Sequence, residues 1–278
     1  MIVRSLFRRK RGAIKPRITA VGVPDFWPTA YDVNPAGFDA GYALGPLFDK
    51  LRSKPAKGKL VATIGRLLAV TYKSFGAVTT LALNGFDADA MKVARSMFEN
   101  EVIAEYLRKH PELVQDYLDF IRVSMHEDFD FLQRESLDLL AGLPTETLNA
   151  INTEIGRIDA RFRKKSGALK NSWKNNQLKD MAVETGREHI YRSIYRWGSG
   201  LVHGDVSVLV SGFDASIGDV DVGPSTKWTH TALMTAHKAV LCLMDSFNEE
   251  GKLGFDADVA VAVEAFKKAW KPKPEQTE

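Results

Sequence analysis

Hydrophobic positions recur every three to four residues along most of the chain, which is the period of amphipathic helices. Gly, Pro and Asn residues separate these segments, as is typical of helix ends. The expected helices cover residues 36–52, 57–83, 87 to about 110, 111 to about 140, 145–165, 178–203, 228–248 and 256–270. Residues 204–226 are rich in Gly, Asp and Ser and predict a loop with a short strand. Successive helices with short connections predict an all-α helical bundle.

Local signals indicate several helix boundaries. Asn84 and Gly85 are expected to end the helix over residues 57–83, and Asp87 is expected to cap the next one. Pro111 suits a first helical turn, and we expect a break around residues 126–130 within the helix that follows.

The two ends of the chain differ in composition from its middle. Residues 1–35 are basic and then rich in proline and aromatic residues, which predicts an extended N-terminal arm. Residues 36–270 are expected to form a single helical domain, and the polar residues 271–278 a flexible tail.

Positive charge is concentrated in two segments of an otherwise ordinary globular composition, with 45% hydrophobic and 26% charged residues. Residues 1–17 hold seven basic residues and no acidic one, and residues 161–175 hold six and none. Such segments contact nucleic acid or are solvated, and both interpretations stay open. The candidate nucleic-acid-binding residues are Arg8, Arg9, Lys10, Arg11, Arg161, Arg163, Lys164 and Lys165.

The single cysteine, Cys242, excludes a disulfide framework within the chain and fits a reducing compartment. The longest apolar stretch, residues 67–83, contains a lysine, a serine and three threonines and is too polar to span a membrane. We also find no apolar run of signal-peptide length near residue 1, and we expect a cytoplasmic protein without a membrane span.

The densest candidate chemistry lies in residues 191–205, YRSIYRWGSGLVHGD. On one helix, the polar residues of this segment fall within a stripe about 60° wide. They are Arg192, Arg196, Ser199 and His203. A second stripe, nearly opposite, is apolar and consists of Ile190, Ile194, Trp197 and Leu201. The polar face is therefore either a site or a solvated helix face with a histidine near its C-terminus.

Arg196 and His203 are seven residues apart, close to two helical turns, so both side chains can reach one substrate group. A guanidinium binds a phosphate in a bidentate way, and a neutral imidazole accepts or returns a proton near pH 7. Ser199, between them, is placed to donate a hydrogen bond to a phosphate oxygen. These groups suit cleavage of an RNA phosphodiester, and the arrangement needs no metal.

The chain resembles HEPN domains, which are helical ribonucleases with an Arg-x4–6-His motif, and more specifically the DUF5677 family. Three segments carry the resemblance: residues 94–99 (ARSMFE), residues 173–186 with Trp173, Met181 and Gly186, and the ending Tyr195-x3-Ser199-x3-His203-Gly204. HEPN nucleases usually have a polar residue directly after the arginine, where this chain has Trp197.

The resemblance covers residues 60–248 and implies a HEPN-like core there, a homodimer formed through the motif helix, and metal-independent ribonuclease activity. It implies that Arg196 and His203 are catalytic, with Ser199 and Tyr195 beside them. We therefore expect an RNA-cleaving enzyme of phage defence or a toxin, with RNA as a partner and no cofactor. The alternatives are a non-catalytic helical interaction module and a nucleic-acid-binding subunit that acts with a partner protein in a defence complex.

Arg95 and Glu99 are four residues apart and are expected to have a structural role. They form either an ion pair on their own helix or hydrogen bonds to the motif helix. No Glu-x-x-His motif accompanies Glu99, Glu101 and Glu105, so we expect no di-metal centre.

Overall fold

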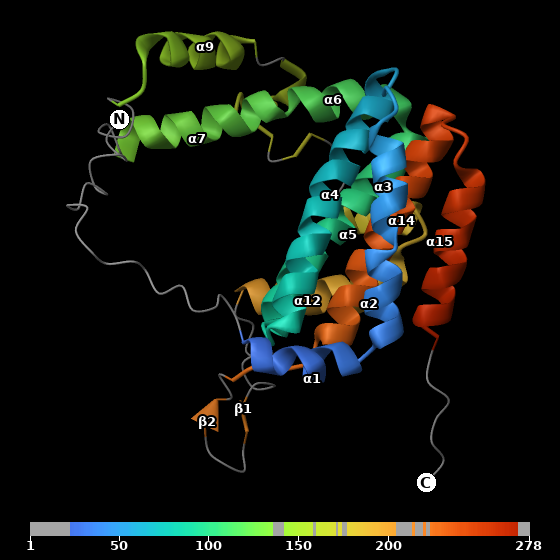
Figure 1. Ribbon diagram of the computed structural model, residues 1–278. Helices are drawn as coiled ribbons and strands as arrows, with labels where there is room; N and C mark the ends of the chain where they lie inside the picture. Colours follow the sequence, from blue (N-terminus) through green and yellow to red (C-terminus); the bar gives the residue numbers. More distant parts are fainter. Residues whose placement is uncertain are drawn as a thin grey trace, which may run out of the picture. The chain divides into compact units, whose positions relative to one another are not determined.

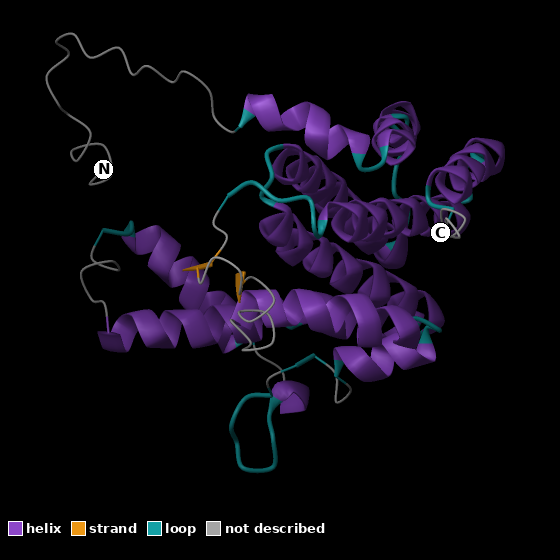
Figure 2. Ribbon diagram, turned by 90° about the horizontal axis from the view of Figure 1, so that it is seen from below, coloured by secondary structure: helices purple, strands orange, loops and turns teal. Residues whose placement is uncertain are grey.

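The computed structural model describes residues 23–135, 142–157, 160–170, 172–173, 177–203, 213–214, 219–220 and 223–271 (Figure 1). Helices make up nearly all of the described elements, drawn in purple in Figure 2, and the predicted all-α helical bundle is confirmed. The described strands are β1 (Phe213–Asp214) and β2 (Asp219–Val220), which pair antiparallel with Phe213 opposite Val220. They fall within the predicted loop.

The chain divides into two compact units. The described part of the smaller unit lies within residues 112–177, and that of the larger unit lies within residues 23–111 and 178–271. The single helical domain over residues 36–270 stays a prediction.

Three long helices form the centre of the larger unit: α4 (Lys59–Leu83), α5 (Asp87–Lys109) and α14 (Thr229–Gly251). They pack side by side (Figure 1) because each carries a buried apolar stripe, with Ile64 in α4, Met97 in α5 and Leu243 in α14 fully enclosed. Gly65 lets α4 approach α14, since a Cβ at Gly65 would lie 2.9 Å from the Phe247 ring.

Shorter helices cover one side of this centre. α2 (Pro35–Tyr42), α3 (Leu44–Arg52) and α15 (Asp256–Ala269) pack on one another and on α14. The Asn34 side chain accepts a hydrogen bond from the Gly37 amide and donates one to the Ala269 carbonyl at 3.1 Å. Residues 36–52, predicted as one helix, form two, because α2 ends at Tyr42 and α3 begins at Leu44.

Part of the predicted extended arm is helical. η1 (Pro24–Phe26) and α1 (Trp27–Asp32) precede α2, and Pro28 stands in the first turn of α1, where a proline is tolerated. The Val23 amide and the Trp27 indole both donate to Oδ1 of the buried Asn84, at 2.8 and 3.0 Å, which holds this segment against the end of α4. Residues 1–22 lie outside the described residues, together with Arg8, Arg9, Lys10 and Arg11.

The predicted end of α4 is confirmed, since Asn84 follows its last residue and Gly85 has a φ of 76°. The predicted cap at Asp87 is wrong, because Asp87 is the first residue of α5 and Phe86 precedes it without a side-chain cap. The buried Asp87 carboxylate instead accepts hydrogen bonds from the Trp228 amide at 2.5 Å and the Ser225 hydroxyl at 3.2 Å. It therefore fixes the start of α14 to the start of α5.

The helices that follow η2 (Pro111–Leu113) belong to the smaller unit. They are α6 (Val114–Asp119), α7 (Ile121–Glu135), α9 (Thr145–Gly156) and η3 (Ala160–Phe162). The predicted break at 126–130 is wrong, because the helix breaks at Phe120. Arg122 joins α6, α7 and α9 by hydrogen bonds to Asp119 at 2.6 Å and to Glu154 at 2.9 Å.

Candidate functional site

The motif segment of the larger unit is not the single helix predicted over residues 178–203. It comprises α10 (Leu178–Glu184), α11 (Glu188–Ile190), the π-helix η4 (Tyr191–Tyr195) and α12 (Arg196–His203). The break falls at Gly186, whose φ of 74° lies in the left-handed region that favours glycine. From Glu188 to His203 the segment is continuously helical.

A buried ion pair holds the turn that begins this segment. The Arg187 guanidinium donates to Glu101 Oε1 of α5 at 2.7 Å and to the Thr185 carbonyl at 2.6 Å. Glu101 is 1% exposed, so its charge is satisfied inside the protein by Arg187. Burial acts to lower the pKa of Arg187, but the carboxylates of Glu101 and Glu105 outweigh it and the pKa is raised. The ion pair therefore sets where the motif segment leaves α5.

Gly198 brings α12 close to α5. It is buried, and a Cβ at this position would lie 3.0 Å from Arg95 Cβ and 3.5 Å from the Met91 carbonyl oxygen. The helix is not interrupted at this glycine, because α12 runs from Arg196 to His203. Arg196 and His203 therefore keep the separation of about two turns that the sequence predicts.

Arg95 and Glu99 form both of the contacts considered for them. Arg95 Nη2 lies 3.0 Å from Glu99 Oε1 on the same helix and donates to the Tyr195 hydroxyl at 2.6 Å. The guanidinium also lies over the Tyr195 ring, 4.5 Å from its centroid. Burial raises the pKa of Tyr195, and the charge of Glu99 raises it further. Tyr195 is therefore a neutral phenol in a fixed position.

The face of this segment holds an open cavity of about 410 Å³. Its lining residues are Tyr191, Tyr195, Arg196, Ser199, Gly200 and His203. Arg196 and His203 are exposed and Ser199 is partly exposed. Within the described part of the chain, these three side chains make no hydrogen bond or ion pair with one another or with other residues. A guanidinium, a hydroxyl and an imidazole thus face one cavity with their polar atoms open to a ligand.

Two residues of the predicted stripes, Arg192 and Trp197, do not lie where the helical spacing predicts. Arg192 does not line the cavity and instead forms an ion pair with Glu188 at 2.7 Å. Trp197, expected on the apolar stripe, is 47% exposed, and its ring is tilted by 43° to the Trp228 ring, with ring centroids 5.7 Å apart.

The basic residues of the second segment lie in the smaller unit, whereas the cavity lies in the larger unit. Arg161, Arg163, Lys164 and Lys165 are all exposed. Arg161 forms ion pairs with Asp116 and Asp119, so part of its charge is neutralised within the unit. The Arg163 guanidinium donates to the Gly167 carbonyl at 3.1 Å. Nucleic-acid binding by these residues stays a prediction.

Sequence reasoning missed Arg187 as the anchor of the turn and Tyr191 as a cavity residue. Nothing near Arg187 in the sequence indicates its partner, because Glu101 is 86 residues away. The spacing Tyr191-x3-Tyr195 was the available signal for a pair of rings on one helix face.

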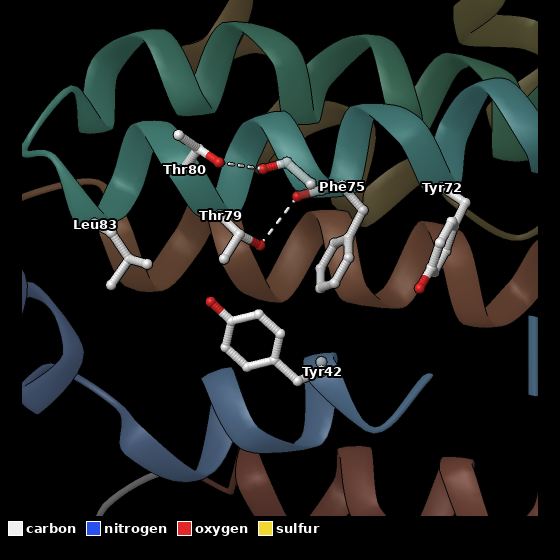
Figure 3. A pocket seen from close by; sticks show the side chains of 8 residues that line it. Tyr42, Tyr72, Phe75, Thr79, Thr80 and Leu83 are labelled. Carbon is white, nitrogen blue, oxygen red and sulfur yellow. Dashed lines mark hydrogen bonds between the residues drawn. The ribbon is translucent and has the colours of Figure 1, made fainter. Parts of the chain in front are cut away.

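A second cavity, of about 310 Å³, lies between α2 and α4 of the larger unit. Figure 3 shows Tyr42 of α2 facing α4, with Tyr72, Phe75 and Leu83 along the opposite wall. The Thr79 and Thr80 hydroxyls are bonded to carbonyls of their own helix. This cavity is thus lined by aromatic and aliphatic groups, in contrast to the polar cavity on α12.

The described residues place no three His, Cys, Asp or Glu side chains together as a metal site. They also include no helix with the length and apolar character needed to cross a membrane.

The larger unit is thus a helical bundle with a polar cavity on a short helix. The family of unknown function DUF5677 matches residues 61–218, which is more than half of the chain. The protein belongs to this DUF5677 family. No curated protein and no solved structure matches the chain.

Proposed function

We propose that this protein is a HEPN-like endoribonuclease that cleaves RNA without a metal ion, in phage defence or as a toxin. The observation that carries the proposal is the cavity on which Arg196, Ser199 and His203 converge with their polar atoms open. The biological setting rests on the resemblance of the motif to HEPN domains.

The chemistry follows from the properties of these groups. The His203 imidazole takes the proton of a ribose 2′-hydroxyl, and the 2′-oxygen attacks the adjacent phosphorus. The bond from phosphorus to the 5′-oxygen breaks, and that oxygen takes a proton from water. The His203 imidazolium gives its proton to the hydroxide that remains, which restores the neutral imidazole. The products are a 2′,3′-cyclic phosphate and a 5′-hydroxyl. Arg196 binds the non-bridging oxygens and stabilises the charge that develops on them, and Ser199 donates a further hydrogen bond.

Two exposed apolar side chains on α12 support the proposed homodimer. Trp197 is 47% exposed and Val202 is 44% exposed, and both lie on α12, the helix that carries the site. A second copy packed on this helix would cover them and bring two cavities together.

His203 and Arg196 each have a matched control on the same segment. His189 is exposed and lies outside the cavity, so His189→Ala controls for His203→Ala. Arg192 serves in the same way for Arg196. We expect wild-type protein to cleave single-stranded RNA in the presence of EDTA. His203→Ala should lower the rate by about 10²- to 10⁴-fold, and His189→Ala should not.

Circular dichroism establishes that each variant is folded. Undiminished cleavage by folded His203→Ala protein would refute the assignment of His203. Loss of wild-type activity in EDTA, restored by a divalent ion, would refute the metal-free mechanism.

The non-catalytic interaction module is the second candidate, and the exposure of Trp197 favours it. It predicts that wild-type protein cleaves no RNA, whereas Trp197→Ser changes the oligomeric state measured by light scattering. Cleavage by wild-type protein that depends on His203 would exclude this alternative.

A further inference from the structure

Tyr191 and Tyr195 form a stacked pair of rings at the edge of the polar cavity. Their ring centroids are 4.9 Å apart and their planes differ by 17°. Both side chains line the cavity together with Arg196 and His203. Tyr191 is partly exposed there, and within the described residues its hydroxyl has no hydrogen-bond partner.

Tyr195 is the fixed member of the pair. Its hydroxyl accepts from Arg95 at 2.6 Å, the Arg95 guanidinium lies over its ring, and Phe98 lies 6.0 Å away, centroid to centroid. Tyr191 stacks on this fixed ring and is therefore held in an orientation before any ligand binds. A ring held in this way loses little conformational freedom on binding, which favours affinity.

The π-helix places Tyr191 beside the catalytic face. Hydrogen bonds in a π-helix join residues five apart, so Tyr191 and Arg196 are separated by about one turn of the widened helix. An aromatic ring that is one turn from a guanidinium matches the chemistry of single-stranded nucleic acid, in which a base alternates with a phosphate.

We propose that Tyr191 is a stacking platform for one unpaired nucleobase next to the phosphate held by Arg196, so that the substrate is single-stranded RNA. The inference rests on the proposed function, since it takes RNA as the ligand of this cavity. In duplex RNA each base is already paired and stacked and the major groove is too narrow for side chains, so Tyr191 has no base to stack on. Tyr191 thus selects unpaired RNA over duplex RNA.

The test measures RNA binding in the His203→Ala background, in which cleavage does not interfere. The probes are a fluorescein-labelled 12-nucleotide single-stranded RNA of mixed sequence and the same strand annealed to its complement. Tyr191→Leu should weaken binding of the single strand by about 5- to 150-fold, as loss of one base–aromatic stack does. It should leave duplex binding unchanged, so that the preference for single strands disappears.

Three variants separate stacking from other roles. Tyr191→Phe keeps the ring and should retain the wild-type affinity. Tyr42→Leu removes a tyrosine that is 60% exposed in the second cavity (Figure 3) and should change nothing. Arg196→Ala should instead lower the slope of log Kd against log salt concentration by the amount that corresponds to about one phosphate contact. Tyr191→Leu should leave this slope unchanged.

Single-strand binding by Tyr191→Leu that equals wild-type binding overturns the inference, as does an equal loss with Tyr191→Phe. If RNA is cleaved by the wild type while Tyr191→Leu binds normally, the inference fails and the nuclease stands. If the single strand is bound through Tyr191 but wild-type protein never cleaves it, the nuclease fails and the stacking platform stands.

Discussion

Acidification should destabilise this protein through His237, a histidine of α14 that is 1% exposed. Its Nδ1 accepts a hydrogen bond from the Trp270 indole at 3.1 Å, so the neutral ring carries its proton on Nε2. The rings of Phe75, Phe266 and Trp270 lie around it, and Nε2 has no partner among the described residues. Burial without a compensating partner lowers the pKa of His237 to about 4 from 6.5.

The sign of the effect follows from proton linkage. Between pH 6.5 and pH 4 the unfolded chain binds a proton at this histidine and the folded protein does not, so stability falls as the pH falls. Above pH 6.5, His237 is neutral in both states and causes no loss of stability. With these two pKa values, about 2 kcal/mol of the free energy of unfolding is lost at pH 5, and about 3 kcal/mol once the pH is below 4.

Urea denaturation at pH 7.5 and at pH 5.0 measures this loss. His237→Gln keeps an acceptor for the Trp270 indole but does not titrate, so the difference between the two pH values should shrink by about 2 kcal/mol. His230→Gln is the control, since His230 is exposed on the same helix and its ring also contacts Trp270. The His237 ring proton resonances, followed by NMR, give the pKa of the folded state directly.

A titration midpoint near 6.5 for His237 in the folded protein would refute the reasoning. So would a pH dependence of stability that His237→Gln leaves unchanged while His230→Gln reduces it.

Two predictions concern how the motif segment is held on α5. Gly198→Ala gains about 1 kcal/mol of helix propensity but forces a Cβ against Arg95, which costs about 1–3 kcal/mol, so the variant should be neutral or destabilised. Gly76→Ala is the control, because no atom lies within 4 Å of its new Cβ, and it should be stabilised by about 1 kcal/mol. If urea denaturation shows the same stabilisation for Gly198→Ala as for Gly76→Ala, α12 does not approach α5 as closely as the structure shows. Glu101→Leu removes the carboxylate nearest to Arg187 and leaves it only Glu105, at 3.5 Å, so it should lower the free energy of unfolding by about 3 kcal/mol. Adding Arg187→Met should restore most of that loss, and a double variant as unstable as the single one would show that the pair does not interact.

The long helices could be predicted from the sequence because their signals are local. The helix predicted over 57–83 is observed from Lys59 to Leu83, and its end lies at the Asn-Gly pair that predicts it. The predicted ends of α5 and α14 likewise lie within a few residues of the observed ends, because the apolar period and the flanking glycines and acidic residues mark them. Each of these features acts within one or two helical turns.

The errors fall where distant residues decide the local structure. Gly186 lies in a stretch with helical periodicity, and the break there is held by a carboxylate, Glu101, from another helix. Asp87 is a residue type that is common at helix N-caps, but its carboxylate instead accepts a hydrogen bond from the backbone amide of Trp228, 141 residues away. No pattern within the segment distinguishes these roles from the ordinary ones.

The sequence predicted the residues of the candidate site that lie in α12, and Tyr195 just before it, but not Tyr191. Arg196, Ser199 and His203 share an α-helix and line one cavity, as their spacing predicts. Tyr191 joins them because the preceding turn is a π-helix. A turn of π-helix contains more residues than a turn of α-helix, so Tyr191, five residues before Arg196, lies about one turn from it. Calculated for an α-helix, the same five residues would place the two side chains about 140° apart. The aromatic part of the site therefore depends on one widened turn, which a uniform helical period leaves out.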